Sequence, residues 1–225
     1  MKKNNNKTTK RPYNKALKYF TFLLVIFLIY EINNLTKYLG REYEYIDSYY
    51  SIEEPIKEEN YDNETITINE IDLNIEKLYE YELKGYVVST FTYLPYNLAN
   101  KLSPKDITVV WDDLVKKENL SKVKFVQSGD RFVISSVKDN DWYEKYGDFT
   151  HKFSNNHLIP ASKEARKQIR KIKKGDYIKI KGYLVRVKSI NAGYDFYWNT
   201  STSLYDTGLS CELIYVEEVK WLKEK

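Results

Sequence analysis

The stretch Asp176–Ile190, DYIKIKGYLVRVKSI, is the strongest strand signal in the sequence and decides the fold class. Its apolar residues occupy even positions at Ile178 and Ile180 and odd positions from Tyr183 onward. Because side chains alternate between the two faces of a strand, this switch indicates a local bend or bulge. Gly182 lies at the switch, and a glycine inside a strand is typical of a sharp corner. The stretch therefore predicts a strand that bends at a barrel corner.

The rest of the C-terminal region predicts further short strands and few helices. Segments rich in β-branched and aromatic residues occur at 65–73, 81–93, 194–203 and 213–221, and a hairpin is predicted at 122–137. Ser162 is a predicted N-cap for a basic helix that ends at Gly175. The pair Ser103-Pro104 resembles a second helix start. We predict an α+β fold, mostly antiparallel β, forming a small barrel or sheet with one basic helix; an OB-like barrel is one candidate.

The N-terminal region predicts a membrane anchor that precedes this domain. Residues 19–30, YFTFLLVIFLIY, carry no charge, and the apolar segment 16–32 is interrupted only by Lys18 and Glu31. A helix of this length spans about 25 Å, which is the short end for a bilayer crossing. Seven basic residues lie in 1–18, whereas two follow within twenty residues of the segment. This asymmetry predicts a cytoplasmic N-terminus and an extracytoplasmic domain.

A cleaved secretory signal is the alternative for the same segment, because signal peptides have apolar cores of similar length. Cleavage needs small residues before the cut, and the sequence EINNLTKYLG after Tyr30 offers no such pair. We therefore favour an uncleaved single-pass anchor in the cell membrane. The predicted organisation is a basic cytoplasmic tail at 1–18, a transmembrane anchor at 19–32, an acidic stalk at 33–64 and a β-rich extracytoplasmic domain at 65–222.

The composition excludes several classes of site. The chain has 225 residues, a formal net charge of +4, one cysteine and two histidines. A single cysteine excludes a disulfide scaffold and a cysteine-rich zinc site. The spacing of His151 and His157 is not that of two ligands on one helix face. Dinucleotide and phosphate-loop fingerprints do not occur in the sequence, and we predict neither a metal nor a cofactor.

Two polar clusters are candidates for catalysis. The segment Asn155–His157 offers an imidazole that could act as a general base, with an asparagine to orient it. The segment Asp206–Gly208 lies just before Cys211, so a nucleophilic cysteine site could be assembled from both clusters. The simpler interpretation is that these groups bond to nearby backbone and that the cysteine is a small buried apolar residue. The candidate catalytic residues are His157, Asn155, Asp206 and Cys211.

The segment 163–188 is a candidate binding surface, because it contains eleven basic and two acidic residues. It could contact nucleic acid, anionic lipid headgroups or cell-wall polymers. The simpler interpretation is a solvated helix face followed by a solvated strand face. The candidate binding residues are Lys163, Arg166, Lys167, Arg170, Lys171, Lys179, Lys181 and Arg186.

Five short motifs occur in a fixed order along the domain. They are LSPKD at 102–106 with Trp111, VQS at 126–128 with Arg131-Phe132, SNNHLIPA at 154–161, KGYLV at 181–185, and DTG at 206–208 with Cys211-Glu212. In this order and spacing, the chain resembles a bacterial family of small, N-terminally anchored proteins of uncharacterised function over about residues 66–219. The resemblance implies membrane anchoring and the extent of the domain, and it implies no activity.

Three hypotheses for function follow. The first is a membrane-anchored extracytoplasmic module, without enzymatic activity, that binds a protein partner or helps to assemble the cell envelope. The second is a hydrolase that uses His157 with Asn155 and with Asp206 or Cys211. The third is a binder of nucleic acid or of an anionic polymer through residues 163–188. Convergence of the catalytic candidates in one pocket would favour the second hypothesis.

Overall fold

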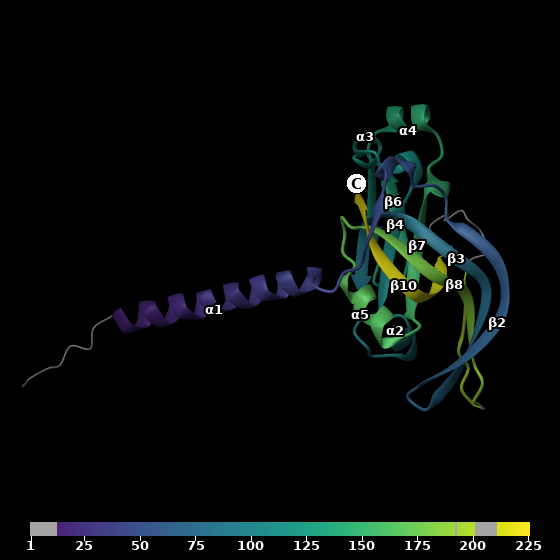
Figure 1. Cartoon of the computed structure of the whole chain (residues 1–225), viewed down its shortest axis with the longest axis horizontal. Helices are drawn as coiled ribbons and strands as arrows, with labels where there is room; N and C mark the ends of the chain where they lie inside the picture. The colour runs from purple at the N-terminus through teal and green to yellow at the C-terminus, as the bar shows by residue number, and fades with distance from the viewer. Residues whose placement is uncertain (1–12, 192, 201–210) are drawn as a thin grey trace, which may run out of the picture. The chain divides into compact units, whose positions relative to one another are not determined.

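The computed structural model describes residues 13–191, 193–200 and 211–225, without the side chains of 13–16, 33–38 and 51. The chain divides into two compact units, Met1–Gly40 and Arg41–Lys225. The first unit contains helix α1 (Tyr13–Tyr38), which Figure 1 draws as one continuous helix. All residues from 17 to 32 are exposed in this helix. Within the described residues, no helix is identified that has both the length and the apolar character needed to span a membrane.

The second unit is built around a closed ring of strands. In ring order these are β3 (Ile71–Thr92), β4 (Lys105–Val110), β7 (Phe153–Pro160), β10 (Glu212–Glu224) and β8 (Tyr177–Ser189). Each strand pairs with the next, and β8 pairs back with β3. The pairing of β7 with β10 is parallel, and the other pairings in the ring are antiparallel. The unit is therefore α+β with mostly antiparallel strands.

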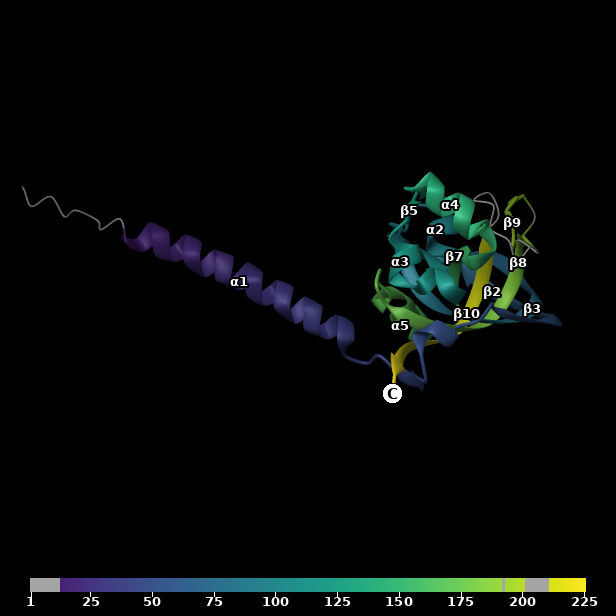
Figure 2. The same ribbon diagram turned by 90° about the horizontal axis from the view of Figure 1, so that it is seen from above.

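Shorter elements extend and cover the ring. The additional strands are β1 (Tyr43–Ile46) beside β10, β2 (Ile56–Ile68) beside β3, β9 (Tyr197–Asn199) beside β8, and the predicted hairpin of β5 (Val123–Gln127) and β6 (Val133–Val137). The helices are α2 (Leu98–Leu102), α3 (Lys117–Leu120), α4 (Asn140–Tyr146) and α5 (Lys163–Lys171), with short 3-10 turns η1 (Tyr49–Ser51), η2 (Asp112–Val115) and η3 (Thr150–Lys152). Helices α3 and α4 lie at one end of the ring and α2 and α5 at the other (Figure 1). Seen from above, β5 and α3 lie on the side opposite to β8 and β9 (Figure 2).

Gly182 allows β8 to pair with two strands at the same point. It is in register with Tyr81 of β3 and with Val216 of β10. A Cβ atom on Gly182 would lie 2.1 Å from the carbonyl oxygen of Tyr215, closer than real Cβ atoms approach. The register of β10 shifts between Val216 and Glu218, which is a bulge directly beyond this contact. The predicted corner is therefore present, and the close approach of two backbones explains why it needs glycine.

The alternation of side chains along β4 and β7 separates the core from a polar outer face. Ile107, Val109 and Leu158 belong to the apolar cluster that fills the ring. Residues at the alternate positions point to the opposite face of the same strands. On this outer face lie Asp106, Thr108, Asn155 and His157.

The structure differs from the predicted acidic stalk at 33–64, because the second unit begins at Arg41 and not at residue 65. Strand β1 pairs with β10, and β2 pairs with β3 along most of its length. The composition concealed β2 because it is an exposed strand with many acidic side chains. Two of these, Asp62 and Glu64, lie 3.6 and 3.3 Å from the ammonium of Lys77 on β3.

Arg41 fixes the start of the second unit. Its guanidinium donates to both carboxylate oxygens of Asp176, at 3.1 and 3.0 Å, and the Arg41 side chain is 3% exposed. The indole N–H of Trp221 donates to the same carboxylate at 2.9 Å. The Arg41 guanidinium also lies over the Trp221 ring, 4.5 Å from its centroid. These buried contacts bind residue 41 into the ring, which is incompatible with a solvated spacer at this position.

Two local predictions also differ from the structure. The segment 65–73, predicted as one strand, contains the turn between β2 and β3, with Asn69 and Glu70 at φ values of 51° and 66°. A two-residue turn with positive φ at both positions matches the twist of a hairpin. The pair Ser103-Pro104 follows α2 instead of starting a helix, because the β-branched residues after it continue as β4.

Replacing Gly182 with alanine should destabilise the fold strongly, because the added Cβ would force β8 away from β10. We expect the free energy of unfolding to fall by about 2–3 kcal/mol, measured by denaturant titration of the full chain. Gly129→Ala is the matched control, since its Cβ would lie at an ordinary 3.6 Å from the Phe91 ring. We expect the control to change stability by less than about 0.5 kcal/mol. Equal effects of the two substitutions would contradict the role assigned to Gly182.

Candidate functional site

A buried polar cluster on the outer face of β4 and β7 centres on Asp106. Tyr93 donates its hydroxyl to Asp106 Oδ2 at 2.7 Å, and Arg131 Nη1 donates to Oδ1 at 3.1 Å. His157 Nδ1 lies 2.9 Å from Oδ2, at ion-pair distance but without the alignment of a hydrogen bond. Asp106 is fully buried and His157 is 3% exposed. The carboxylate therefore accepts hydrogen bonds from Tyr93 and Arg131 and has the His157 imidazole beside it, in a site closed to solvent.

Arg131 connects the β5–β6 hairpin to this carboxylate, and we call the contact between Arg131 and Asp106 the latch. Arg131 lies in the hairpin turn with a positive φ of 68°. Its Nη2 donates to Asn100 Oδ1 at 2.7 Å and to the Ser103 carbonyl at 3.0 Å. The guanidinium also lies 3.9 Å from the centroid of the Tyr93 ring. The latch thus holds the hairpin and α2 against β4.

Burial shifts the pKa values of Arg131 and Tyr93, which both contact Asp106. Burial lowers the pKa of the Arg131 guanidinium, and the charge of Asp106 opposes this change. Burial raises the pKa of the Tyr93 hydroxyl well above its usual range, and the Asp106 charge and hydrogen bond raise it further. Tyr93 therefore stays neutral and continues to donate its proton to Asp106 at physiological pH.

A second chain of hydrogen bonds runs beside the latch and reaches Cys211. Thr108 Oγ1 donates to Gln127 Oε1 at 2.9 Å, and Gln127 Nε2 donates to Asn155 Oδ1 at 2.6 Å. The Asn155 amide donates to the Arg131 carbonyl and to Cys211 Sγ, both at 3.1 Å. These bonds fix the hairpin to β7 at a second point.

The structure brings some of the predicted catalytic residues together and separates others. Asn155 contacts Cys211, and His157 lies against Asp106 and the Trp198 ring, whose centroid is 5.0 Å from the imidazole centroid. The contacts of His157 are with Asp106 and Trp198, whereas the Cys211 thiol contacts the Asn155 amide and the Arg131 carbonyl. Asp206 lies outside the described residues. The described part of the chain also contains no group of three or more His, Cys, Asp and Glu side chains arranged for a metal.

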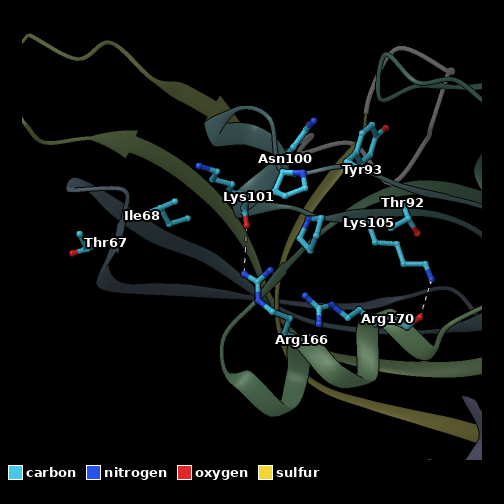
Figure 3. A pocket seen from close by; sticks show the side chains of 11 residues that line it. Thr67, Ile68, Thr92, Tyr93, Asn100, Lys101, Lys105, Arg166 and Arg170 are labelled. Carbon is cyan, nitrogen blue, oxygen red and sulfur yellow. Dashed lines mark hydrogen bonds between the residues drawn. The ribbon is translucent and has the colours of Figure 1, made fainter. Parts of the chain in front are cut away.

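A pocket of about 430 Å³ lies next to the latch and shares Tyr93 and Asn100 with it. Figure 3 shows side chains from the end of β2, β3, α2, β4 and α5 around it. Its basic lining residues are Lys101, Lys105, Arg166 and Arg170, and no aspartate or glutamate is among the lining residues. The pocket therefore has an excess of positive charge.

The two arginines of the pocket lie one helical turn apart on α5. Burial lowers the pKa of Arg166, and the charge of Arg170 lowers it further. Arg166 Nη2 donates to the Lys101 carbonyl at 3.4 Å. Within the described residues, the Arg170 guanidinium and the Lys101 ammonium have no hydrogen-bond or ion-pair partner. These charges are available to a ligand.

Lys105 has a different role in the same pocket, since its ammonium lies beneath the end of α5. It donates to the carbonyl oxygens of Arg170, at 3.4 Å, and of Ile172. Carbonyl groups at a helix C-terminus lack partners within the helix and attract a cation. Lys105 therefore fixes α5, with its two arginines, to the start of β4.

The structure reduces the predicted binding surface at 163–188 to a smaller site. Three of its basic residues are paired with acidic side chains of neighbouring strands: Lys179 with Glu44, Lys181 with Glu82 at 3.0 Å, and Arg186 with Glu76 at 3.0 Å. Lys167 lies 3.0 Å from Glu164 on its own helix. Arg166 and Arg170 line the pocket, whereas Lys163 and Lys171 do not. The segment thus does not present one continuous basic face.

No sequence pattern directly indicated the residues that complete the site. Lys101, Lys105 and Tyr93 lie about 60 to 75 positions before the two arginines, and Arg131 lies 25 positions after Asp106. The sequence signal that could have indicated Lys101, Lys105 and Arg131 was their position in or beside the motifs at 102–106 and 126–132. Comparison with protein-family models, with curated proteins and with solved structures finds no match for this chain.

Asp106→Asn should destabilise the protein, because Arg131 would keep a buried positive charge without its counter-ion. Breaking a buried ion pair on one side typically costs about 3–5 kcal/mol, and we expect a loss in that range in denaturant titration of the full chain. Asp112→Asn is the control: this carboxylate is 53% exposed and lies 3.2 Å from Lys152. We expect its loss to stay below about 1 kcal/mol. A stable Asp106→Asn variant would show that the latch does not hold the fold.

Proposed function

We propose that this chain is a single-pass membrane protein whose second unit is an extracytoplasmic binding module for an anionic ligand. The observation that carries the proposal is the pocket beside α5, which four basic side chains and no acidic side chain line. Most basic side chains elsewhere on α5 and β8 have acidic partners, as shown above for Lys167, Lys179 and Lys181. An unbalanced set of charges in a concave site is an electrostatic signature of anion binding.

The sequence supports anchoring through α1. Its uncharged segment 19–30 carries large apolar side chains that are exposed in the chain, such as Phe20 at 65% and Leu23 at 63%. Exposed apolar surface of this extent is rare in a soluble monomer. The excess of basic residues before the segment favours a cytoplasmic N-terminus.

The strand order supports an OB-type barrel. In chain order the ring strands are β3, β4, β7, β8 and β10. The first three are neighbours in the ring, the fifth (β10) pairs in parallel with the third (β7), and the fourth (β8) closes the ring between β10 and β3. Helix α5 lies between the third and fourth ring strands, as in OB-type barrels. Such barrels commonly bind ligands on the face of their second and third strands. Here that face belongs to β4 and β7 and is covered by the hairpin that carries Arg131, so binding is favoured at the neighbouring pocket.

The same geometry gives less support to the other two hypotheses. A hydrolase would need an accessible nucleophile next to a base, whereas His157 is buried against Asp106 and Asn155 is fully buried. Binding of a nucleic acid along residues 163–188 would need a continuous basic surface, and Lys181 and Arg186 are paired with glutamates. A compact anionic group fits the basic pocket beside α5 better.

Membrane anchoring predicts that the full chain stays in the membrane pellet after alkaline carbonate extraction and is released by detergent. The combined substitution Leu23→Arg and Ile26→Arg should release the protein without detergent, because charges at the centre of a spanning helix are costly. External protease should digest the second unit in cells whose outer layers have been removed and whose cell membrane is intact. Extraction of the unmodified chain by carbonate alone would contradict the anchor.

Anion binding predicts that phosphate, sulfate or citrate stabilises the full chain in detergent at constant ionic strength. An anion present at 100 times its dissociation constant adds about 2.7 kcal/mol to the free energy of unfolding, which a thermal or denaturant titration detects. Arg166→Ala with Arg170→Ala should abolish this effect. Lys163→Ala with Lys167→Ala, which removes the same charge from the same helix outside the pocket, should retain it. If none of the three anions stabilises the chain, the proposed function is wrong.

A further inference from the structure

The basic pocket also has an apolar part. Besides its charged groups, the lining includes Ile68 at the end of β2, Pro95 after β3, and Pro104 before β4. Figure 3 shows Arg166 and Arg170 projecting from α5 into the space that Ile68 borders. The site therefore offers cationic and apolar contacts to one ligand.

The volume indicates a ligand larger than a single inorganic anion. At about 430 Å³, the pocket falls in the size range of small-molecule sites. One water occupies about 30 Å³, and an anion of a few heavy atoms would leave most of the space filled with water. The apolar lining residues would then gain nothing from the ligand, so a group attached to the anion must contact them.

The charge arrangement favours phosphate over carboxylate. The Arg170 guanidinium lies close enough to Arg166 for its charge to lower the pKa of Arg166, and Lys101 adds a third cation without a partner among the described residues. A phosphate monoester carries about −1.5 to −2 charges at neutral pH and three acceptor oxygens, whereas a carboxylate carries one charge and two oxygens. Guanidinium groups bind phosphate through paired hydrogen bonds.

The loop that contributes Pro95 exposes large apolar side chains on both sides of it. Leu94 is 61% exposed and Tyr96 is 83% exposed. The pair flanks Pro95 in the sequence and lies outside the pocket lining. Tyrosine and leucine next to basic residues are typical of protein surfaces that contact lipid headgroups and the upper acyl chains.

We infer that the pocket binds the phosphate group of an amphiphilic phosphate ester. Arg166 and Arg170 hold the phosphate oxygens, and Ile68, Pro95 and Pro104 contact the apolar part. This inference rests on the proposed function, that the pocket binds an anion. A soluble phosphate ester and a lipid headgroup share the phosphate, and the exposed Leu94 and Tyr96 favour the lipid.

The test is calorimetric titration of the full chain in phosphatidylcholine nanodiscs, with empty nanodiscs as the blank. The probes are dihexanoyl phosphatidic acid below its micellar concentration, glycerol phosphate, and dihexanoyl phosphatidylcholine. We expect the phosphatidic acid to bind at least tenfold more tightly than either of the other two. Arg166→Ala with Arg170→Ala should weaken its binding at least tenfold, and Lys163→Ala with Lys167→Ala should not.

The exposed pair provides a separate test of the apolar contact. Leu94→Ser with Tyr96→Ser should remove most of the advantage of phosphatidic acid over glycerol phosphate and leave the affinity for glycerol phosphate unchanged. Because both side chains are exposed, the fold should tolerate these changes.

Each remaining outcome separates the inference from the proposed function. Equal affinities for glycerol phosphate and phosphatidic acid would overturn the inference and leave anion binding intact. Equal affinities for phosphatidic acid and phosphatidylcholine, insensitive to the arginine substitutions, would mean apolar adsorption and would also overturn it. Failure of every phosphate compound to bind would overturn the inference, and the stabilisation by sulfate or citrate described above would decide whether the proposed function survives.

Discussion

The architecture of the second unit depends on the contact between Gly182 and the Tyr215 carbonyl. Only a residue without a side chain lets the backbone of β8 come this close to β10 while β8 remains paired with β3. This contact closes the sheet into a ring, and closure removes unpaired edges along the strands involved. The closed ring then gives β4 and β7 a fixed inner face, which is filled by apolar side chains, and a fixed outer face, whose polar groups contact the hairpin.

The polar outer face explains why the basic pocket lies beside the outer face of β4 and β7 and not on it. The latch between Arg131 and Asp106 places the β5–β6 hairpin over these strands, and Asn155 adds a second attachment. Tyr93 and Asn100 contact the latch on one side and line the basic pocket on the other. The buried network therefore has a structural role with a functional consequence, because it sets the position of the pocket wall.

Local sequence signals predicted the features that depend on neighbouring residues. The phase switch at Gly182, the 122–137 hairpin and the Ser162 cap, whose side chain accepts from the Ala165 N–H at 3.0 Å, are such features. The acidic composition of β2 concealed a strand. Its acidic side chains are balanced by the cation of Lys77 on β3, and this pairing joins segments that the local sequence does not connect. The site was also only partly predictable, because local sequence does not show tertiary pairing. The sequence shows that Arg166 and Arg170 share one helix face, whereas the pairing of Lys181 and Arg186 with glutamates depends on tertiary contacts.

The choice of arginine at the two α5 positions has a chemical reason. A half-buried lysine beside another cation can lose its proton, since burial and like charges both lower its pKa. An arginine keeps its charge under the same conditions because its pKa starts far above the physiological range, and the lowered pKa of Arg166 still leaves it charged. The charge of the two arginines is then constant over the physiological pH range. The second ionisation of the proposed phosphate ester occurs near pH 6, so the arginines should form more charge pairs with the dianion above this pH than with the monoanion below it.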